Sequence, residues 1–387
     1  MFNFIIELIN IYKTFKNLKY TRKKYTGELD SNNVPNGFGT CIKQYIKYTG
    51  EWKNGLPDGK GIAIYKQPIY YSLIENELIK YNIFRYEGTV KNGVFHNKGI
   101  LIRNGKLFYE GEFKEGSITG KGELYNDQGK IMYKGDFVNG KFEGKGLLYN
   151  NNNELVYNGS WKYGKKEGYG VLYNPKVSKI ISNYDGYWKN NLYDGEGKLN
   201  EANERRIGTF KNNKQINEGT FTDGVRKYTG YFDNHMFNGY GNLEIINNNK
   251  ISYSYSGQFI NNKFNGNGFI QYKNNNTYNG NFKNNLKEGN GIFYDYKNNY
   301  TIETSWIKNK KNGNGTILYT DGTGFKCSWE NDKLISKKRL IFYENDDLQL
   351  TLKKKKDIPY ELKCPISLEI MQDPVICSDG HTYDRKS

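Results

Sequence analysis

The side chains with the most reactive chemistry lie near the end of the chain, where Cys364, Cys377 and His381 are close together. Thiolates and imidazoles bind zinc, and a thiolate beside an imidazole can act as a nucleophile. A structural zinc site needs four ligands and usually contains a paired Cys-x-x-Cys, which this segment lacks. No further group that would orient His381 accompanies Cys377. The sequence therefore predicts neither a metal site nor a catalytic residue, and it indicates no cofactor.

The residues around these cysteines follow a different pattern. The segment IPYELKCPISLEIMQDPVICSDGHTYDRKS resembles the start of a U-box, which reads Cys-Pro-Ile, then Glu, Met and Asp-Pro-Val, then Asp-Gly-x-Thr-Tyr-Asp-Arg. The resemblance implies a RING-like fold in which hydrogen bonds and salt bridges replace zinc. It implies ubiquitin-ligase activity through docking of a ubiquitin-conjugating enzyme, which Ile366 and Leu368 would contact. It assigns structural roles to Cys364, Pro365, Asp373, Pro374, Asp379, Gly380 and Tyr383.

The U-box resemblance covers only residues 358–387, and a complete U-box is considerably longer. The central helix barely begins, and the second loop of the docking groove does not appear. A hairpin without its helix is marginally stable. We therefore expect a partial U-box that is inactive in the 387-residue chain. Two explanations for the partial box are open: the natural product is longer, or the box has decayed.

The elements that must position this segment are repeats. The stretch YEGEFKEGSITGKGELYNDQGKIM begins at Tyr109, and the same pattern begins again at Tyr133 and Tyr157. Each unit opens with aromatic-x-Gly-x-aromatic and continues with Gly-x-Gly-x-aliphatic. The period of two is that of a β-strand, and the Gly and polar residues between the two halves are typical of a hairpin turn. Each unit is therefore predicted to be a hairpin in which aromatic rings lie over the glycines of a neighbouring strand.

These units occupy most of the chain and resemble MORN repeats. The resemblance implies an all-β fold, an elongated antiparallel meander with one hairpin per repeat. Thirteen units give about 26 strands and, at ~4.8 Å per strand, a length of about 120 Å. The unit that opens at Tyr48 carries an insertion at residues 66–85. The units open at Tyr25, Tyr48, Tyr86, Tyr109, Tyr133, Tyr157, Tyr184, Tyr228, Tyr255 and Tyr278, and in degenerate form near Arg206, Ile302 and Phe325.

We predict four segments in the chain. Residues 1–24 form an amphipathic helix, which either caps the first hairpin or lies on an anionic membrane surface. Residues 25–352 are the MORN repeats, residues 353–357 are a basic linker, and residues 358–387 are the partial U-box. The chain has 35 Tyr and 21 Phe residues, and because an open, one-layer sheet buries little surface, its packing is expected to come from half-buried aromatics.

The net charge of +16 does not by itself indicate a nucleic-acid partner. Only 8 of the 57 basic residues are arginine, the usual reader of bases and clamp of phosphates. Lys, Asn, Ile and Tyr are enriched together, as A/T-rich codon usage would produce. We therefore expect no nucleic acid as a partner, although an acidic partner or an anionic phospholipid surface remains an alternative.

The four cysteines form no disulfide framework, and no secretory leader is evident. These features predict an intracellular, cytoplasmic protein, with peripheral membrane association as an alternative. The combined resemblances favour an adaptor whose repeats bind a protein target and whose U-box recruits a ubiquitin-conjugating enzyme. It would be a ubiquitin transferase of the RING/U-box type only if the box is completed. The alternative is a non-catalytic scaffold or membrane-surface tether with a decayed U-box.

Overall fold

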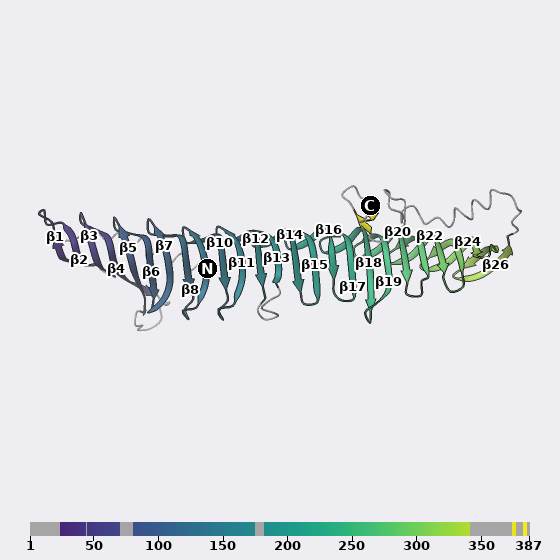
Figure 1. The fold of residues 1–387 in the computed structure, drawn as a ribbon, viewed down its shortest axis with the longest axis horizontal. Helices are drawn as coiled ribbons and strands as arrows, with labels where there is room; N and C mark the ends of the chain where they lie inside the picture. The colour runs from purple at the N-terminus through teal and green to yellow at the C-terminus, as the bar shows by residue number, and fades with distance from the viewer. Residues whose placement is uncertain are drawn as a thin grey trace, which may run out of the picture. The chain divides into compact units, whose positions relative to one another are not determined.

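The computed structural model describes residues 24–43, 45–69, 80–174 and 182–340, together with two short strands at 374–376 and 382–384. The described residues form strands β1 to β26 of an antiparallel sheet and a separate two-stranded pair, β27 and β28, and they contain no α-helix (Figure 1). The all-β meander and its 26 strands are therefore confirmed. The predicted N-terminal helix lies almost entirely outside the described residues, as do the basic linker and most of the U-box.

The chain divides into two compact units at the end of β14. The first unit contains β1 (Tyr25–Leu29), β2 (Pro35–Lys43), β3 (Ile46–Lys53), β4 (Leu56–Ile69), β5 (Lys80–Lys91), β6 (Val94–Arg103), β7 (Lys106–Lys114), β8 (Ser117–Tyr125), β9 (Ile131–Val138), β10 (Lys141–Tyr149), β11 (Leu155–Lys162), β12 (Lys165–Tyr173), β13 (Ser182–Lys189) and β14 (Leu192–Glu201). The residues of β15 (Glu204–Lys211) are shared between the two units. The second unit continues with β16 (Lys214–Thr222), β17 (Arg226–Asp233), β18 (Met236–Asn247), β19 (Lys250–Ile260), β20 (Lys263–Tyr272), β21 (Thr277–Lys283), β22 (Leu286–Asp295), β23 (Tyr300–Ile307), β24 (Lys310–Tyr319), β25 (Gly324–Glu330) and β26 (Lys333–Arg339), and then β27 (Pro374–Ile376) and β28 (Thr382–Asp384).

A two-residue turn with positive φ at both positions closes the repeat hairpins. In the first unit the turn is typically Asn-Gly, as at Asn92–Gly93 and Asn139–Gly140. In the second unit it becomes Asn-Asn, as at Asn261–Asn262 and Asn284–Asn285. Two consecutive positive φ values define a type I′ turn, whose twist matches that of the flanking strands. The predicted hairpin turns are thus confirmed, and asparagine and glycine occur there because they tolerate this conformation.

These turns also tie each hairpin to the one before it. The backbone N–H of Gly140 donates to the carbonyl oxygen of Ile118 at 2.9 Å. The Asn-Asn turns add a second bond. The N–H of Asn262 donates to the carbonyl of Phe237 at 2.9 Å, and the Phe237 N–H donates back to Asn262 Oδ1 at 2.6 Å. Asparagine at the second turn position therefore doubles the connection between successive hairpins.

The aromatic rings lie over bare backbone, as predicted from the sequence. Gly111 of β7 faces Gly122 of β8, and the Tyr109 ring covers both. A Cβ atom built on Gly122 would lie 2.6 Å from Cε2 and Cζ of Tyr109, so only glycine fits beneath the ring. The Tyr109 hydroxyl donates to the backbone oxygen of Glu112 at 3.2 Å, which satisfies the one polar group of the buried side chain.

The expectation of half-buried aromatics was wrong. Nine opening tyrosines have less than 2% of their surface exposed: Tyr48, Tyr86, Tyr109, Tyr133, Tyr157, Tyr184, Tyr228, Tyr255 and Tyr278. Apart from Tyr48, which packs on Trp52 of its own repeat, each ring contacts rings of its own repeat and of the next one. Tyr133 stacks on Phe142 with centroids 3.6 Å apart, and the edges of Phe137 and Trp161 approach at 5.1 and 5.7 Å. This arrangement forms one aromatic core in the first unit and an aromatic core over much of the second, where a smaller cluster around Trp329 is separate.

Two degenerate repeats lack the opening tyrosine, and in both of them the first glycine is replaced as well. Where Ile302 replaces the opening tyrosine, Thr304 replaces the first glycine. Thr304 is 4% exposed, and its hydroxyl donates to the Asn314 carbonyl at 3.3 Å. In the next repeat Cys327 occupies the glycine position and is buried. A side chain is tolerated at this position where the large tyrosine is absent.

The insertion at residues 66–85 lengthens an existing hairpin. β4 and β5 pair continuously from Gly59↔Val90 to Ile69↔Lys80, well beyond the length of neighbouring strands. Residues 70–79, which lie between these two strands in the sequence, are outside the described residues.

The last strand of the sheet, β26, has an unusual composition. Its sequence is KLISKKR, and all seven residues are exposed. Within the described residues, β26 pairs with β25, in a register that places Phe325 opposite Arg339. Among the described strands, β26 is thus a strongly basic strand that is paired on one side.

Candidate functional site

The two faces of the sheet differ chemically because side chains alternate along each strand. In β7, Tyr109 and Phe113 are buried on the aromatic face. Glu110 and Glu112 lie between them in the sequence and project from the opposite face. We call this second surface the polar face, and it is where the described repeats present charge to solvent.

A hollow of about 880 Å³ lies on the polar face of the first unit. The backbone of Gly99, Gly111, Gly122 and Gly135 forms its floor, because these glycines face one another in sequence across β6 to β9. Its charged lining alternates in sign and consists of Glu87, Lys98, Glu110, Glu112, Lys121, Glu123, Lys134, Asp136 and Lys145.

The charges in this hollow are partly paired with one another. Lys134 Nζ lies 2.8 Å from Glu123, and the Tyr125 hydroxyl donates to the same carboxylate at 2.7 Å. The hydrogen bonds from Lys134 and Tyr125 lower the pKa of Glu123. Glu110 lies directly opposite Glu123 in the ladder, so two carboxylates share this part of the surface. Interleaved carboxylates would repel the phosphates of a nucleic acid, whereas a protein surface with charges of both signs would complement them.

An exposed tyrosine pair continues this polar face. Tyr169 and Tyr187 lie opposite each other across β12 and β13, with ring centroids 5.7 Å apart. Each ring is nearly half exposed, at 46% and 49%. Tyr169 precedes the glycine of its strand just as Lys121 does in β8, so both project from the same face. Exposed tyrosines of this kind are enriched in protein–protein interfaces, where they often supply much of the binding energy.

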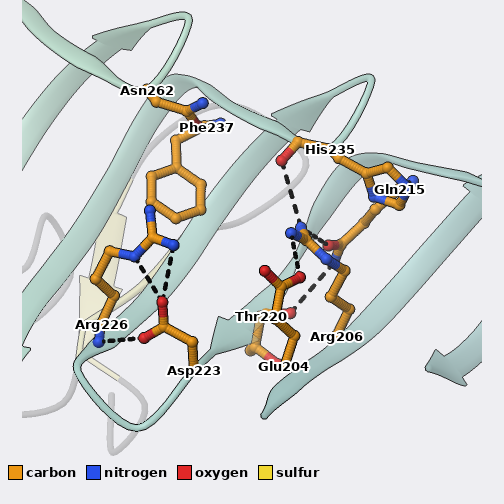
Figure 2. Close-up of polar contacts among 9 residues, drawn as sticks. All are labelled: Glu204, Arg206, Gln215, Thr220, Asp223, Arg226, His235, Phe237 and Asn262. Carbon is orange, nitrogen blue, oxygen red and sulfur yellow. Dashed lines mark hydrogen bonds and ion pairs between the residues drawn. The ribbon is translucent and has the colours of Figure 1, made fainter. Parts of the chain in front are cut away.

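The degenerate repeat in the second unit contains a buried polar cluster in place of stacked rings (Figure 2). Arg206 occupies the position of an opening tyrosine, and Gln215 occupies the position held by Phe237 in the next repeat. Gln215 is fully buried; its Nε2 donates to the carbonyl of Ile207 at 3.0 Å, and its Oε1 accepts from Arg206 at 3.5 Å. The Gln215 amide nitrogen is also the side-chain atom nearest to where a Cβ on Gly219 would lie. An amide thus covers the glycine here, where other repeats use a tyrosine.

Arg206 and His235 make further polar contacts in this cluster. Arg206 forms an ion pair with Glu204 at 3.0 Å and donates to the carbonyl oxygen of His235 at 3.3 Å, as Figure 2 shows. Its guanidinium lies 4.4 Å from the centroid of the Phe221 ring. His235 accepts the Gln215 backbone N–H through Nδ1 at 3.1 Å, a role that asparagine fills elsewhere. Because these groups satisfy one another, the cluster is a structural substitute for stacked rings.

Lysine replaces the stacked ring in other repeats. Lys287 holds the position of Phe264, and its ammonium lies 4.6 Å from the Tyr278 centroid and 4.8 Å from the Trp306 centroid. Lys166 is arranged in the same way over Tyr157, at 4.9 Å. Desolvation lowers the pKa of both lysines.

The described ranges contain no group of three His, Cys, Asp or Glu residues that could hold a metal ion. Nor do they include a helix whose length and apolar character would let it cross a membrane.

The U-box segment is described only at two strands. β27 and β28 pair antiparallel, with Pro374 opposite Asp384 and Val375 opposite Tyr383. The structure thus places the backbone of Pro374 and Tyr383 in one hairpin. The other predicted positions lie outside the described residues: Cys364, Pro365, Ile366, Leu368, Asp373, Asp379 and Gly380.

Sequence reasoning did not identify the residues that depart chemically from the repeat. The repeat near Arg206 was described only as degenerate, and Gln215 and Lys287 were not singled out. The signal that identifies them is alignment within the repeat, because each stands where the other copies carry a ring.

Comparison with known proteins agrees with both resemblances. The sequence model of the MORN repeat matches residues 48–67, 86–105, 109–130, 133–154, 157–176, 184–199, 228–249, 255–277, 278–300 and 305–324, which together exceed half of the chain. These matches leave out residues 200–227, where Arg206 and Gln215 lie. The model of the U-box domain matches residues 358–387.

Two curated relatives are U-box domain-containing proteins that match the chain over short stretches. The chain is 68% identical over 31 residues to U-box domain-containing protein 1 of Medicago truncatula, which is 8% of this chain and 4% of that protein. It is 54% identical over 44 residues to U-box domain-containing protein 19 of Arabidopsis thaliana, covering 11% and 6% of the two chains. The chain thus spans only a small fraction of the length of these relatives. The repeats that fill most of the sequence and the box near its end establish that the chain belongs to the MORN-repeat family and carries a U-box segment.

Proposed function

We propose that the protein is an adaptor of the ubiquitin-ligase type. In this proposal the U-box segment docks a ubiquitin-conjugating enzyme, and the polar face of the repeats binds the protein that receives ubiquitin. The observation that carries the proposal is the presence of both modules in one chain, with repeat matches from residue 48 to 324 and a U-box match at 358–387.

The chemistry of the polar face supports its role in target binding. The hollow on the first unit offers carboxylates and ammonium groups at close spacing over a rigid glycine floor. Tyr169 and Tyr187 offer exposed rings on the same face of the same unit. A protein target with complementary charges and an apolar contact for the tyrosines would use both features.

The proposed mechanism is proximity. The conjugating enzyme carries ubiquitin as a thioester, and the target lysine attacks that thioester when both are held on one adaptor. The gain comes from making an encounter of two molecules effectively unimolecular. No covalent intermediate on Cys364 or Cys377 is part of this proposal.

The first experiment tests the docking of the conjugating enzyme. The 387-residue chain is titrated by calorimetry against a panel of purified conjugating enzymes, and discharge of their ubiquitin thioester to free lysine is followed in parallel. We expect at least one enzyme to bind, with binding lost in Ile366→Ala and in Leu368→Ala, whereas thioester discharge should not accelerate, because the partial box is expected to be inactive. Glu112→Lys, on the polar face, is the matched control and retains binding. If no enzyme in the panel binds the unsubstituted chain, the ligase proposal is overturned and a non-catalytic scaffold is favoured.

The second experiment tests the polar face. Ubiquitin-modified proteins are quantified in cells that express the unsubstituted chain, Tyr187→Ala, Glu112→Lys or Ile366→Ala. A target is a protein whose modification falls with all three substitutions. Tyr163→Ala is the control, because Tyr163 is 68% exposed but lies in a hairpin turn, outside the glycine rows. Modification that depends on Ile366 but is unchanged by the substitutions of Tyr187 and Glu112 would refute the assignment of the polar face.

A further inference from the structure

The second unit contains a trough on its aromatic face that the proposed function does not use. This hollow has a volume of about 560 Å³ and is lined mainly by aliphatic and aromatic side chains, among them Leu243, Ile245, Ile270, Tyr253 and Tyr272. The side chains of Arg226, Lys287 and three asparagines also line it, so the hollow combines apolar surface with polar groups, as small-molecule sites do. The first unit carries its large hollow on the opposite, polar face, so the two surfaces differ in kind.

Two cations line the trough, and they differ in how they are satisfied. Arg226 is paired with Asp223: its Nε and Nη2 each lie 2.8 Å from one carboxylate oxygen, and Figure 2 shows this pair. The ammonium of Lys287, in contrast, makes no hydrogen bond or ion pair within the part of the chain that the structure describes. Its contacts are with rings. Lys287 is therefore the uncompensated charge of the trough.

The surroundings of Lys287 are unusually apolar for an ammonium group. Its Nζ lies between 4.6 and 5.4 Å from the centroids of four rings, those of Tyr272, Tyr278, Phe293 and Trp306. The faces of these rings attract the cation but provide no hydrogen-bond acceptor. Burial among them, together with the nearby charge of Lys311, lowers the pKa of Lys287 to about 8.

The other ionisable groups around Lys287 do not neutralise it. The charge of Asp332 raises the pKa of Lys287, but this carboxylate is paired with Lys311 at 3.0 Å. Burial raises the pKa values of Tyr272 and Tyr278, so both phenols stay neutral near physiological pH. A bound anion would therefore supply the one interaction that the ammonium lacks.

We propose that this trough binds a free long-chain carboxylate, with the carboxylate on Lys287 and the hydrocarbon chain on the aliphatic and aromatic lining. The apolar lining runs from Ile245 in β18 to Lys287 in β22, four strand spacings or about 19 Å. A single uncompensated cation at one part of an apolar trough matches one negative head group on one apolar chain. This inference is independent of ubiquitin transfer, and its test does not involve a conjugating enzyme.

The probe is dodecanoate below its micellar concentration, titrated into the full chain by calorimetry. We expect one molecule of dodecanoate to bind per chain. The affinity for dodecan-1-ol should be at least tenfold lower, and butanoate should show no measurable binding. Lys287→Met keeps the apolar stem on the rings and removes the charge. This substitution is expected to lower the affinity for dodecanoate at least tenfold and to leave the affinity for dodecan-1-ol unchanged. Lys287→Arg should retain most of the affinity for dodecanoate.

The chain offers a matched control for these substitutions. Lys166 has the same repeat position and also lies over rings, but it is in the first unit and does not line the trough. Lys166→Met is therefore expected to bind dodecanoate like the unsubstituted chain. Equal losses in the two methionine variants, or no loss in Lys287→Met, would overturn the proposal. Binding to anionic phospholipid vesicles without binding of free dodecanoate would overturn it as well, because it would indicate a membrane surface as the ligand.

A pH series gives a second readout that a purely structural role of Lys287 would not produce. The free chain must carry a protonated Lys287 to bind the carboxylate, and about nine-tenths of that charge is lost between pH 7 and pH 9 for a pKa near 8. The affinity for dodecanoate should fall by roughly tenfold over this interval. The affinity for dodecan-1-ol should stay constant, and a carboxylate affinity that is equally constant would contradict the role of Lys287.

Discussion

Replacing Gly122 by alanine tests the idea that tyrosine rings over bare backbone hold the repeats together. The added methyl group would lie 2.6 Å from two ring carbons of Tyr109. The ring cannot withdraw easily, because the rings of Phe113 and Phe137 pack against it at 5.3 and 5.4 Å and its hydroxyl is bound to the Glu112 carbonyl. Overpacking of this kind costs about 1–3 kcal/mol.

The decisive variant removes the ring before the methyl group is added. Tyr109→Leu alone is expected to destabilise the hairpin by about 2–4 kcal/mol, because it removes a fully buried ring and two edge-to-face contacts. In the leucine background, Gly122→Ala meets no ring and is expected to be neutral or to stabilise by about 0.5 kcal/mol, as alanine does where the backbone allows it. The two substitutions should therefore show a coupling energy of about 1.5–3 kcal/mol.

Hydrogen–deuterium exchange of peptides from β7, β8 and β9 is the suitable assay, because a repeat protein opens locally and a global unfolding curve would average over many hairpins. A local loss of 2 kcal/mol accelerates exchange roughly 30-fold, since 1.4 kcal/mol corresponds to a factor of ten. Gly129→Ala is the control. Its methyl group would have no neighbour within 4 Å, and its cost comes from φ of +78°, so it should be the same in both backgrounds. An equal cost of Gly122→Ala with and without the tyrosine would refute the reasoning.

Three further predictions follow from the second unit. Asn285→Gly keeps the positive φ but removes the side-chain oxygen that accepts the Phe264 N–H at 2.7 Å. The free energy that protects this amide should fall by about 1 kcal/mol, and its hydrogen exchange should accelerate accordingly. Asn284→Gly should have little effect on the same amide. The folded-state pKa of Lys287, about 8, lies below the reference value of 10.5, so the unfolded chain binds more protons between these pH values and stability rises with pH across this window. After allowance for solvent screening, this gain in the free energy of unfolding is about 1 kcal/mol. The gain should be absent in Lys287→Met, and a Lys287→Met variant with the same pH profile as the unsubstituted chain would contradict the prediction. Finally, Arg206→Tyr combined with Gln215→Phe should raise the melting temperature by restoring stacked rings, worth about 1–3 kcal/mol, while either substitution alone should lower it by leaving a buried polar partner unsatisfied. A double variant no more stable than the single ones would show that the polar cluster is not a substitute for the rings.

The fold could be predicted because the sequence of each repeat indicates both which residues share a face of the sheet and where the strands turn. The alternation of Tyr109, Gly111 and Phe113 fixes which side chains share a face, and the Asn-Gly pairs fix where the strands turn. The depth of burial could not be obtained in this way. Alternation shows that rings share a face, but it does not reveal that Phe142 and Trp161 close over Tyr133 and remove it from water.

The sites were less accessible to sequence reasoning than the fold. Alignment within the repeat places Lys287 at a ring position, but it does not show that rings from several strands surround its ammonium group. The polar hollow of the first unit arises from charges that the strand register brings together, as with Glu110 and Glu123. The U-box positions could be assigned from sequence pattern, and for Ile366 and Leu368 the assignment stays a prediction.

The basic strand β26 has a consequence for self-assembly. A meander built from identical hairpins presents unpaired backbone at an edge strand, and such an edge can recruit a strand from another copy and grow into filaments. Lys333, Lys337, Lys338 and Arg339 place four positive charges on this strand. Two copies that approached each other through β26, the last described strand of the sheet, would therefore repel each other, so the charge discourages pairing between the β26 strands of two copies.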